Sequence, residues 1–171
     1  MHNYPVKKLL IRWYENNKRD LPWRNKLQNK RYDPYLVLVS EIMLQQTTVP
    51  TVARRYLEFI NKWPTVRDLS KASESQILKF WSGLGYYRRA LNLLKCAKIL
   101  NSKYKCIIPH KYEDLSNLPG IGRYTAKAIQ GIVFNKPVIA IDANIERVVT
   151  RINGLSKPKN LIKKEIESFS E

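Results

Sequence analysis

The chain has 171 residues, and its 31 lysines and arginines against 14 aspartates and glutamates give a formal net charge of +17. Such a charge indicates a polyanionic partner, most plausibly nucleic acid, with a lysine-rich solubilising surface as the alternative. The composition excludes a transmembrane helix, because no apolar segment reaches the roughly eighteen residues needed, and the N-terminus lacks the apolar region of a signal peptide.

The first part of the chain is predicted to be helical apart from one loop. Residues 5–16 have helical apolar spacing, and the residues on the apolar face are Val6, Leu9, Leu10 and Trp13. A polar loop is expected over residues 25–33. Residues 35–47 are ambiguous, because their apolar start alone would suit a strand, but the continuation through Gln46 favours a buried helix.

Short helices separated by Pro, Gly and Ser also account for the middle of the chain. A helix is expected over residues 50–63, and its core face is Val52, Tyr56, Phe59 and Ile60. Ser73 and Gln76 form a capping box at the start of a helix that ends near Trp81. Residues 83–85 then break the chain before a basic helix, whose apolar face is Ala90, Leu93, Leu94, Ala97 and Leu100. The predicted fold class is therefore all-α.

Two glycines separated by one residue follow a Leu-Pro pair at residues 118–122. Neither proline nor glycine suits a helix interior, yet both flanks, residues 112–117 and 126–133, have the apolar spacing of helices. The segment predicts a helix, a tight hairpin and a second helix whose first N–H groups are unpaired. Such a terminus can accept an anion, and glycine lets a phosphate group approach the backbone closely. The alternative is an ordinary turn in a helical bundle.

Glu41 is the only charged residue between Asp33 and Arg54. On a helix, its neighbours three and four positions away include Val37, Leu38 and Leu44. A carboxyl group among such side chains is desolvated, which raises its pKa and suits it to donate a proton near neutral pH. The alternative is a solvent-facing glutamate on an amphipathic helix.

Asp142 follows the apolar run 138–141 and precedes a helix whose apolar residues are Ile145, Val148, Val149 and Ile152. An aspartate in this setting is well placed as a helix N-cap. A carboxylate paired with an acid is also what cleavage of a glycosidic bond requires. One group protonates the leaving group and the other stabilises an oxocarbenium-like sugar. Both interpretations of Asp142 stay open.

Several segments of the chain, taken together, resemble one known family. They are Ser40-Glu41-Ile42-Met43-Leu44-Gln45-Gln46-Thr47, Gly83-Leu84-Gly85-Tyr86-Tyr87-Arg88-Arg89-Ala90, and Leu118–Ala126 with Asp142. In these segments the chain is similar to the helix-hairpin-helix (HhH-GPD) DNA glycosylase superfamily, and most similar to its MutY-type adenine DNA glycosylases. The similarity begins near residues 21–24 and runs to the end of the chain. It implies an all-α helical bundle of the helix-hairpin-helix DNA glycosylase type.

The resemblance implies a base-excision repair enzyme. It would hydrolyse the N-glycosidic bond of an adenine mispaired with 8-oxoguanine or guanine in double-stranded DNA. Glu41 matches the acid that protonates the adenine, Asp142 the carboxylate that stabilises the sugar cation, and Asn144 would hold hydrogen bonds of the site. The residues that match the base pocket are Trp23, Arg24, Leu44 and Arg19. Those that match the side chains wedged into the base stack are Gln46 and Tyr86. The hairpin residues that would hold a phosphate group, often with a monovalent cation on the carbonyl oxygens, are Leu118, Gly120, Ile121, Gly122 and Arg123.

Tyr124, which we count among the catalytic residues, stands where bifunctional relatives such as endonuclease III have a lysine that attacks the sugar. Without that amine no Schiff base can form, so a monofunctional enzyme with weak or absent strand cleavage is expected. Tyrosine at this position also occurs in the branch that removes mismatched thymine, so a thymine or uracil mismatch glycosylase is an alternative. An inactive, truncated DNA-binding module is an alternative of another class.

The resemblance also predicts two domains, a six-helix domain at residues 21–134 and an incomplete second domain at residues 1–20 and 135–171. Family members continue into four cysteines that hold a [4Fe–4S] cluster. The two cysteines of this chain, Cys96 and Cys106, match none of them and form neither a metal pattern nor a disulfide framework. We therefore expect a chain truncated before that segment, without a metal or cofactor of its own. We also expect a monomer in an intracellular setting, the cytoplasm or nucleoid, without membrane contact.

Overall fold

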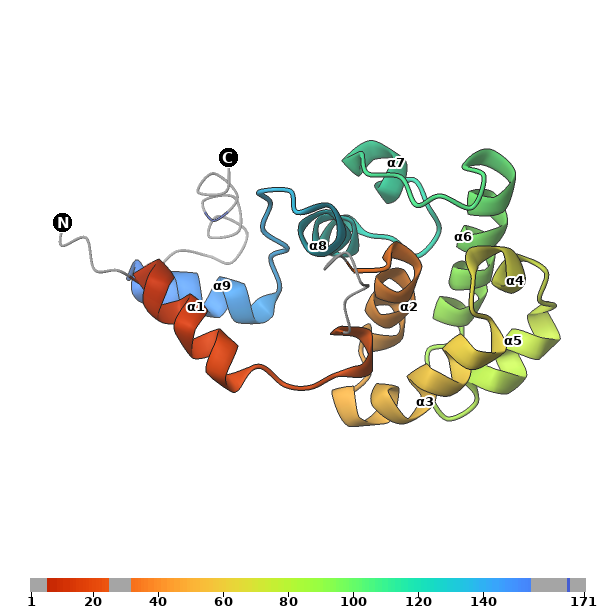
Figure 1. The fold of residues 1–171 in the computed structure, drawn as a ribbon, viewed down its shortest axis with the longest axis horizontal. Helices are drawn as coiled ribbons and strands as arrows, with labels where there is room; N and C mark the ends of the chain where they lie inside the picture. The colour runs from red at the N-terminus through yellow and green to blue at the C-terminus, as the bar shows by residue number, and fades with distance from the viewer. Residues whose placement is uncertain (1–5, 25–31, 155–165, 167–171) are drawn as a thin grey trace.

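The computed structural model describes residues 6–24, 32–154 and 166, and the regular secondary structure of these residues is entirely helical (Figure 1). They contain a short 3₁₀ helix and nine α-helices. The 3₁₀ helix is Pro22–Arg24, and the α-helices are α1 Val6–Asn17, α2 Pro34–Leu44, α3 Val49–Lys62, α4 Val66–Ser70, α5 Glu74–Trp81, α6 Arg88–Lys103, α7 Tyr112–Ser116, α8 Arg123–Phe134 and α9 Ala143–Ile152. This arrangement confirms the predicted all-α fold class.

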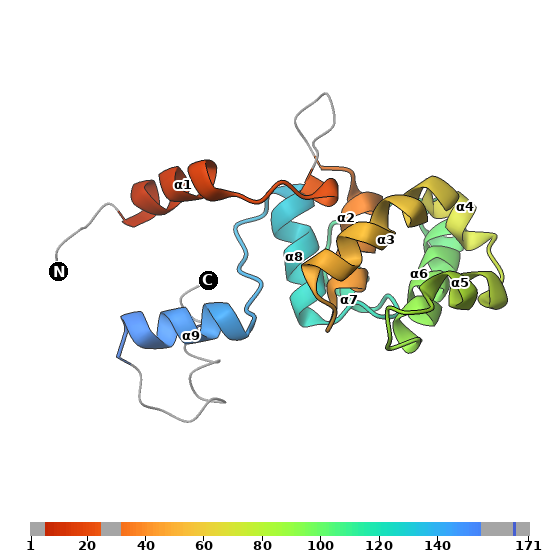
Figure 2. The same cartoon turned by 90° about the horizontal axis from the view of Figure 1, so that it is seen from below.

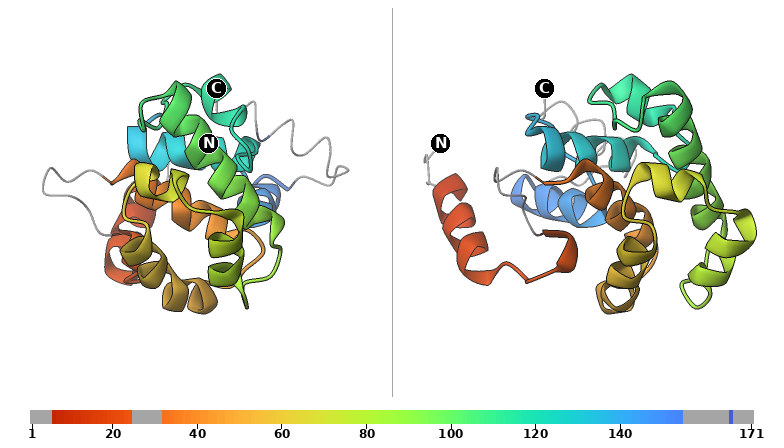
Figure 3. Two further views of the ribbon diagram at one scale, coloured as in Figure 1. Left: turned by 90° about the vertical axis from the view of Figure 1, so that its right-hand side faces the viewer. Right: turned by 45° about the vertical axis from the view of Figure 1, so that its right-hand side comes forward.

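The core of the molecule is built around α2, which contacts α3, α6 and α8 (Figures 1 and 3). Along α2, the side chains of Val39, Ile42 and Met43 are completely buried. The apolar faces predicted for α3 and α6 are the faces that pack into this core. Helices α4 and α5 pack on α6, and α7 packs on α8. Because α2 is enclosed by three helices, its few polar side chains are held in a rigid setting.

A local capping signal explains why residues 35–47 form a helix and not a strand. The Oδ1 atom of Asp33 accepts hydrogen bonds from the backbone N–H groups of Tyr35 at 2.8 Å and Leu36 at 3.2 Å. These bonds satisfy N–H groups that have no partner within the helix. The helix ends at Leu44, so the last residues of the predicted segment form the turn into α3.

The capping box predicted at Ser73 and Gln76 is confirmed, because each residue's side chain accepts a hydrogen bond from the other's backbone N–H. Helix α4 and the 3₁₀ helix were not predicted, because neither reaches two turns and so neither shows an apolar period. Residues 25–31 of the predicted loop, and the residues after 154 other than Ile166, lie outside the described part of the chain.

Helices α1 and α9 lie to one side of the packed helices and are separated from each other (Figure 2). On α1 the exposed fractions of the side chains of Leu9, Leu10 and Trp13 are 56%, 62% and 61%. Helix α9 has no buried residue. The apolar face predicted for residues 5–16 is therefore not a core face within the described residues. The limits of the two predicted domains stay a prediction. No helix in the described ranges is both long and apolar enough to cross a membrane.

Candidate active site

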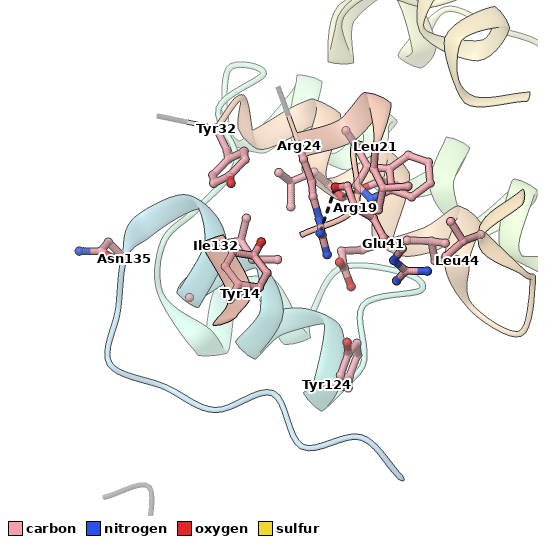
Figure 4. A pocket seen from close by; sticks show the side chains of 15 residues that line it. Tyr14, Arg19, Leu21, Arg24, Tyr32, Glu41, Leu44, Tyr124, Ile132 and Asn135 are labelled. Carbon is pink, nitrogen blue, oxygen red and sulfur yellow. Dashed lines mark hydrogen bonds between the residues drawn. The ribbon is translucent and has the colours of Figure 1, made fainter. Parts of the chain in front are cut away.

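A cavity of about 470 Å³ is lined by residues of the 3₁₀ helix, α2 and α8 (Figure 4). This volume lies within the range of small-molecule pockets. Every residue predicted for the base pocket lines it, namely Trp23, Arg24, Leu44 and Arg19. Glu41 and Tyr124 line the same cavity. The fold thus brings the predicted base pocket together with two of the predicted catalytic residues.

The carboxyl group of Glu41 extends from α2 into this cavity (Figure 4). Burial raises its pKa from 4.5 to about 7. The neighbouring side chains of Val37 and Leu38 are buried, as expected from their helical spacing. The predicted desolvation of Glu41 is therefore confirmed, and the alternative of a solvent-facing glutamate is wrong. A carboxyl group with this pKa is partly protonated at neutral pH and can donate a proton.

The hydroxyl group of Tyr124 lies within the electrostatic range of two carboxyl groups. Burial raises the pKa of this hydroxyl, and the charges of Glu41 and Asp142 raise it further. Tyr124 therefore stays protonated at neutral pH and is a hydrogen-bond donor. Glu41 and Asp142, which lie far apart in the sequence, thus both act on the charge of Tyr124 in the folded chain, and of the two only Glu41 lines the cavity.

Asp142 is the N-cap of α9. Its Oδ1 atom accepts hydrogen bonds from the backbone N–H groups of Asn144 at 3.0 Å and Ile145 at 2.8 Å. Its Oδ2 atom accepts a bond of 3.1 Å from the side-chain amide of Asn144. That amide's oxygen in turn accepts a bond of 3.1 Å from Arg147. The capping interpretation is confirmed. These bonds also fix the orientation of the carboxyl group, and the roles of Asp142 and Asn144 in catalysis stay predictions.

Further residues that the sequence did not indicate also line the cavity; among them are Tyr14, Tyr32, Val49 and Ile132. They come from α1, the segment before α2, α3 and α8, and no local pattern joins them. Arg24, in the 3₁₀ helix, contacts α1 and the segment that follows α1. Its guanidinium carbon lies 5.9 Å from the ring centroid of Tyr14, and its Nη1 donates to the carbonyl oxygen of Arg19 at 3.4 Å.

The predicted hairpin is present between α7 and α8, and its two glycines differ in backbone conformation and in the space available for a Cβ atom. Gly120 has a φ of +82°, and a Cβ atom there would lie 3.0 Å from the Cβ of Asn92. At Gly122, whose φ is −83°, an added Cβ would meet no described atom within 4 Å. The side chains of Leu118 and Ile121 are buried. The two apolar side chains of the hairpin therefore point into the core, and Gly122, which has no side chain, is exposed.

Gly122 is also the N-cap of α8, and it supplies no side chain to bond the first N–H groups of that helix. The exposed residue Arg123 begins the helix. The geometry predicted for accepting an anion is therefore present, and the binding of a phosphate group stays a prediction.

Gln46 and Tyr86, the two residues predicted to wedge into the base stack, are exposed and share a second hollow of about 610 Å³. Both have left-handed backbone conformations, with φ values of +55° and +48°. Such conformations cost roughly 1–3 kcal/mol each in a residue other than glycine and persist only when the surroundings fix them. The fold therefore brings the two residues together and holds them under strain.

The cysteines of the chain do not fit an iron–sulfur cluster, which needs about four thiolate ligands. The sequence contains only two cysteines; Cys96 is buried and Cys106 is half-buried. Within the described residues, no three or more His, Cys, Asp or Glu side chains are grouped so that they could hold a metal ion. At the hairpin, the carbonyl oxygen of Gly120 accepts a hydrogen bond from Gln45, and a monovalent cation there stays a prediction.

Comparison with known proteins relates these features to one family. Residues 39–171 match the HhH-GPD superfamily of base excision DNA repair proteins. The chain is 41% identical over 168 residues to the adenine DNA glycosylase of Buchnera aphidicola subsp. Acyrthosiphon pisum (strain APS), which is 96% of this chain and 47% of that protein. It is 42% identical over 150 residues to the adenine DNA glycosylase of Rattus norvegicus, which is 85% of this chain and 29% of that protein. The chain thus spans about half or less of the length of these relatives.

Solved structures share the helical arrangement. A thermostable thymine-DNA glycosylase superposes with a TM-score of 0.75 at 30% identity, over 85% of this chain and 67% of that one. A trapped endonuclease III–DNA covalent intermediate gives a TM-score of 0.75 at 24% identity, over 92% of this chain and 71% of that one. The second likeness concerns the fold alone. Because the family match covers most of the sequence, the chain belongs to the HhH-GPD superfamily of base excision DNA repair proteins.

Proposed function

We propose that the chain is a monofunctional DNA glycosylase that removes adenine mispaired with 8-oxoguanine or guanine in double-stranded DNA. The observation that carries this proposal is Glu41, a carboxyl group with a pKa of about 7 in a cavity of about 470 Å³. A base inside a duplex cannot reach such a cavity, so the target nucleotide must leave the stack. The relatives named adenine DNA glycosylase support the choice of adenine.

In this proposal, protonated Glu41 donates its proton to the ring of the extruded adenine, which makes the base a better leaving group. The bond from the base nitrogen to C1′ breaks, and its electron pair leaves with the base. The carboxylate of Asp142 stabilises the positive charge on the sugar. Water then adds to C1′ and loses a proton. Because Tyr124 offers no amine, no Schiff base forms and the strand is not cleaved by β-elimination.

Duplex DNA is the proposed partner, and three features of the chain support it. The net charge of +17 would attract the phosphate backbone. The hairpin presents backbone N–H groups at the start of α8, where a phosphate oxygen can accept them. Gln46 and Tyr86 are exposed where they could enter the base stack. Extrusion costs a few kcal/mol of stacking and pairing, which a wedge and phosphate contacts can offset.

Base release from defined duplexes tests this function. The chain is incubated with duplexes that contain A:8-oxoguanine, A:G, T:G or U:G, and hot alkali then cleaves the strand wherever a base has been lost. We expect release from the two adenine duplexes only. Cleavage before the alkali step would contradict the monofunctional mechanism.

A thymine or uracil mismatch glycosylase is the second candidate, because the thermostable thymine-DNA glycosylase shares this fold at 30% identity. Release from T:G or U:G without release from either adenine duplex would establish it. Binding to all four duplexes without any release would instead establish a non-catalytic DNA-binding module.

A further inference from the structure

One arginine inside the molecule joins two loops that carry exposed residues. Arg89 lies in the first turn of α6 and is 7% exposed. Its Nη1 atom donates to the carbonyl oxygens of Ile42 at 3.2 Å and Met43 at 2.8 Å, and also to that of Gln45. These carbonyls lie at the end of α2, where helical carbonyls lack partners within the helix. The positive charge is also favourable at that end of the helix dipole.

The other end of the same guanidinium group bonds the second loop. Its Nη2 atom donates to the carbonyl oxygens of Leu84 at 2.9 Å and Gly85 at 3.1 Å. It also donates to the Oγ1 atom of Thr47 at 2.8 Å, on the far side of the first loop. The guanidinium carbon lies 5.5 Å from the ring centroid of Tyr86. Arg89 is thus the shared partner of the loop after α2 and of the loop before α6.

These bonds surround the two strained residues of the molecule's second hollow. In the first loop, Arg89 bonds the residues on either side of Gln46, and in the second loop it bonds the two residues that precede Tyr86. Gln46 and Tyr86 hold left-handed conformations with φ values of +55° and +48°, which surroundings must impose. The planar fork of an arginine can bond several acceptors in fixed directions, which the point charge of a lysine cannot.

We propose that Arg89 is a positioning residue that holds Gln46 and Tyr86 as one preorganised wedge, an inference that rests on the proposed extrusion of a base from duplex DNA. A wedge that is already ordered loses little conformational entropy when it enters the base stack. Without Arg89, the two loops keep the 3.4 Å bond from the Oγ1 atom of Thr47 to the carbonyl oxygen of Leu84 but lose the bonds that flank Gln46 and precede Tyr86, so each loop must be ordered during extrusion. Arg89 acts on DNA through these two residues and does not contact the reacting atoms.

The test measures extrusion separately from catalysis. All variants are made on a Glu41→Gln background, so that the substrate stays intact, and the A:8-oxoguanine duplex carries 2-aminopurine beside the target adenine. Fluorescence of 2-aminopurine rises when the neighbouring base leaves the stack. We expect the Glu41→Gln chain to produce this rise at saturating protein. We expect added Arg89→Met to lower the equilibrium constant for extrusion by about tenfold or more, because both wedge residues lose their enforced conformation.

Two comparisons separate positioning from a general loss of stability or charge. Lys98→Met removes one exposed positive charge from the same helix and should leave the fluorescence rise unchanged. Arg89→Lys keeps the charge but not the fork and should behave like Arg89→Met. A double-mutant cycle with Tyr86→Ala should be strongly non-additive, because Arg89 acts through the residue already removed. Additive losses, or full rescue by lysine, would overturn the proposal.

Folding is checked by circular dichroism at the assay temperature. If Arg89→Met does not fold, Thr47→Val tests the same link between the loops more gently, because it removes one acceptor of Arg89 and the bond from Thr47 to the carbonyl oxygen of Leu84, and keeps the shape of the side chain. It should reduce extrusion in the same direction, and an unchanged signal would overturn the proposal. An unmodified chain that releases no base would refute the proposed reaction alone, since the fluorescence signal does not require release. A Glu41→Gln chain that gives no rise would refute the wedge.

Discussion

The side-chain Nε2 atom of Gln45 donates hydrogen bonds to the carbonyl oxygen of Gly120 at 3.1 Å and to the Oγ1 atom of Thr125 at 3.3 Å. These bonds join the end of α2, which carries Glu41, to the hairpin and the first turn of α8. The candidate acid and the candidate phosphate-binding backbone are therefore parts of one rigid unit. A DNA strand bound at the hairpin would be placed at a defined distance from the acid.

We predict that Glu41→Gln abolishes base release and leaves DNA binding nearly unchanged. Glutamine keeps the shape of the side chain but cannot donate the proton, and general acid catalysis typically contributes roughly 10²–10⁴-fold. Single-turnover release from the A:8-oxoguanine duplex measures the rate, and electrophoretic mobility shift measures binding. A rate within a few-fold of the parent would show that Glu41 is not the acid.

The rate of base release should fall as the pH rises above about 7. Burial raises the pKa of Glu41 to about 7, so the protonated form that can donate is lost above that pH. Single-turnover rates should therefore decline with one titration near neutrality. They are measured between pH 5.5 and 9, where folded proteins are typically stable. A rate that stays constant across this range would contradict the assignment of Glu41.

The same raised pKa predicts that Glu41→Gln stabilises the fold at high pH. The folded chain binds a proton at Glu41 that the unfolded chain releases near pH 4.5, so stability from this group is present at low pH and is lost as the pH rises towards 7. Above pH 7, glutamine avoids burying the charge, and the gain is at most on the order of 3 kcal/mol. Thermal unfolding at pH 5 and pH 8 measures it. The variant and the parent should differ at pH 8 and converge at pH 5.

Asp142→Asn separates the two roles of Asp142. Asparagine caps helices about as well as aspartate, so the thermal midpoint should change little. If the charge of the carboxylate stabilises the sugar cation, base release should fall strongly in the folded variant. Circular dichroism and single-turnover release together decide the point. Normal release by this variant would leave Asp142 with its capping role alone.

The two hairpin glycines should respond differently to valine. Gly122→Val has open space and an ordinary φ, so it should fold like the parent but bind duplex DNA more weakly, because the side chain blocks the approach of a phosphate. Gly120→Val should lower the stability of the fold by roughly 1–3 kcal/mol, because valine is strained at a positive φ. Thermal unfolding and fluorescence anisotropy of labelled duplex distinguish the two effects.

The salt dependence of duplex binding should be steep in the parent and unchanged in Gly122→Val. Each neutralised phosphate contributes about 0.9 to the log–log slope, so roughly five contacts would give a slope near −4 to −5. Gly122→Val obstructs backbone donors of the hairpin and removes no cation, so it should lower affinity without changing the slope. Titrations at several salt concentrations check this. A slope near zero would contradict the nucleic-acid interpretation of the charge.

Features that depend on short stretches of sequence were predicted well. The capping box at Ser73, the hairpin at residues 118–122 and the desolvation of Glu41 all follow from neighbours within a few positions. The bonds from Arg89 to Met43 and Thr47 could not be predicted, because these acceptors lie at and after the end of α2, which meets α6 only after folding. The same applies to Val49, which reaches the cavity from the start of α3. Local patterns report a residue's own element, whereas these contacts depend on how elements pack.

The distribution of tryptophans has a practical consequence for studying this chain. Trp13 is 61% exposed, whereas Trp23, Trp63 and Trp81 are 8%, 5% and 0% exposed. An aqueous quencher should therefore suppress the emission of Trp13 first. In a Trp13→Phe chain, the remaining emission comes from buried rings, and one of these, Trp23, forms part of the cavity wall. Such a chain would carry its own optical reporter of a base entering the cavity, with no dye attached to protein or DNA.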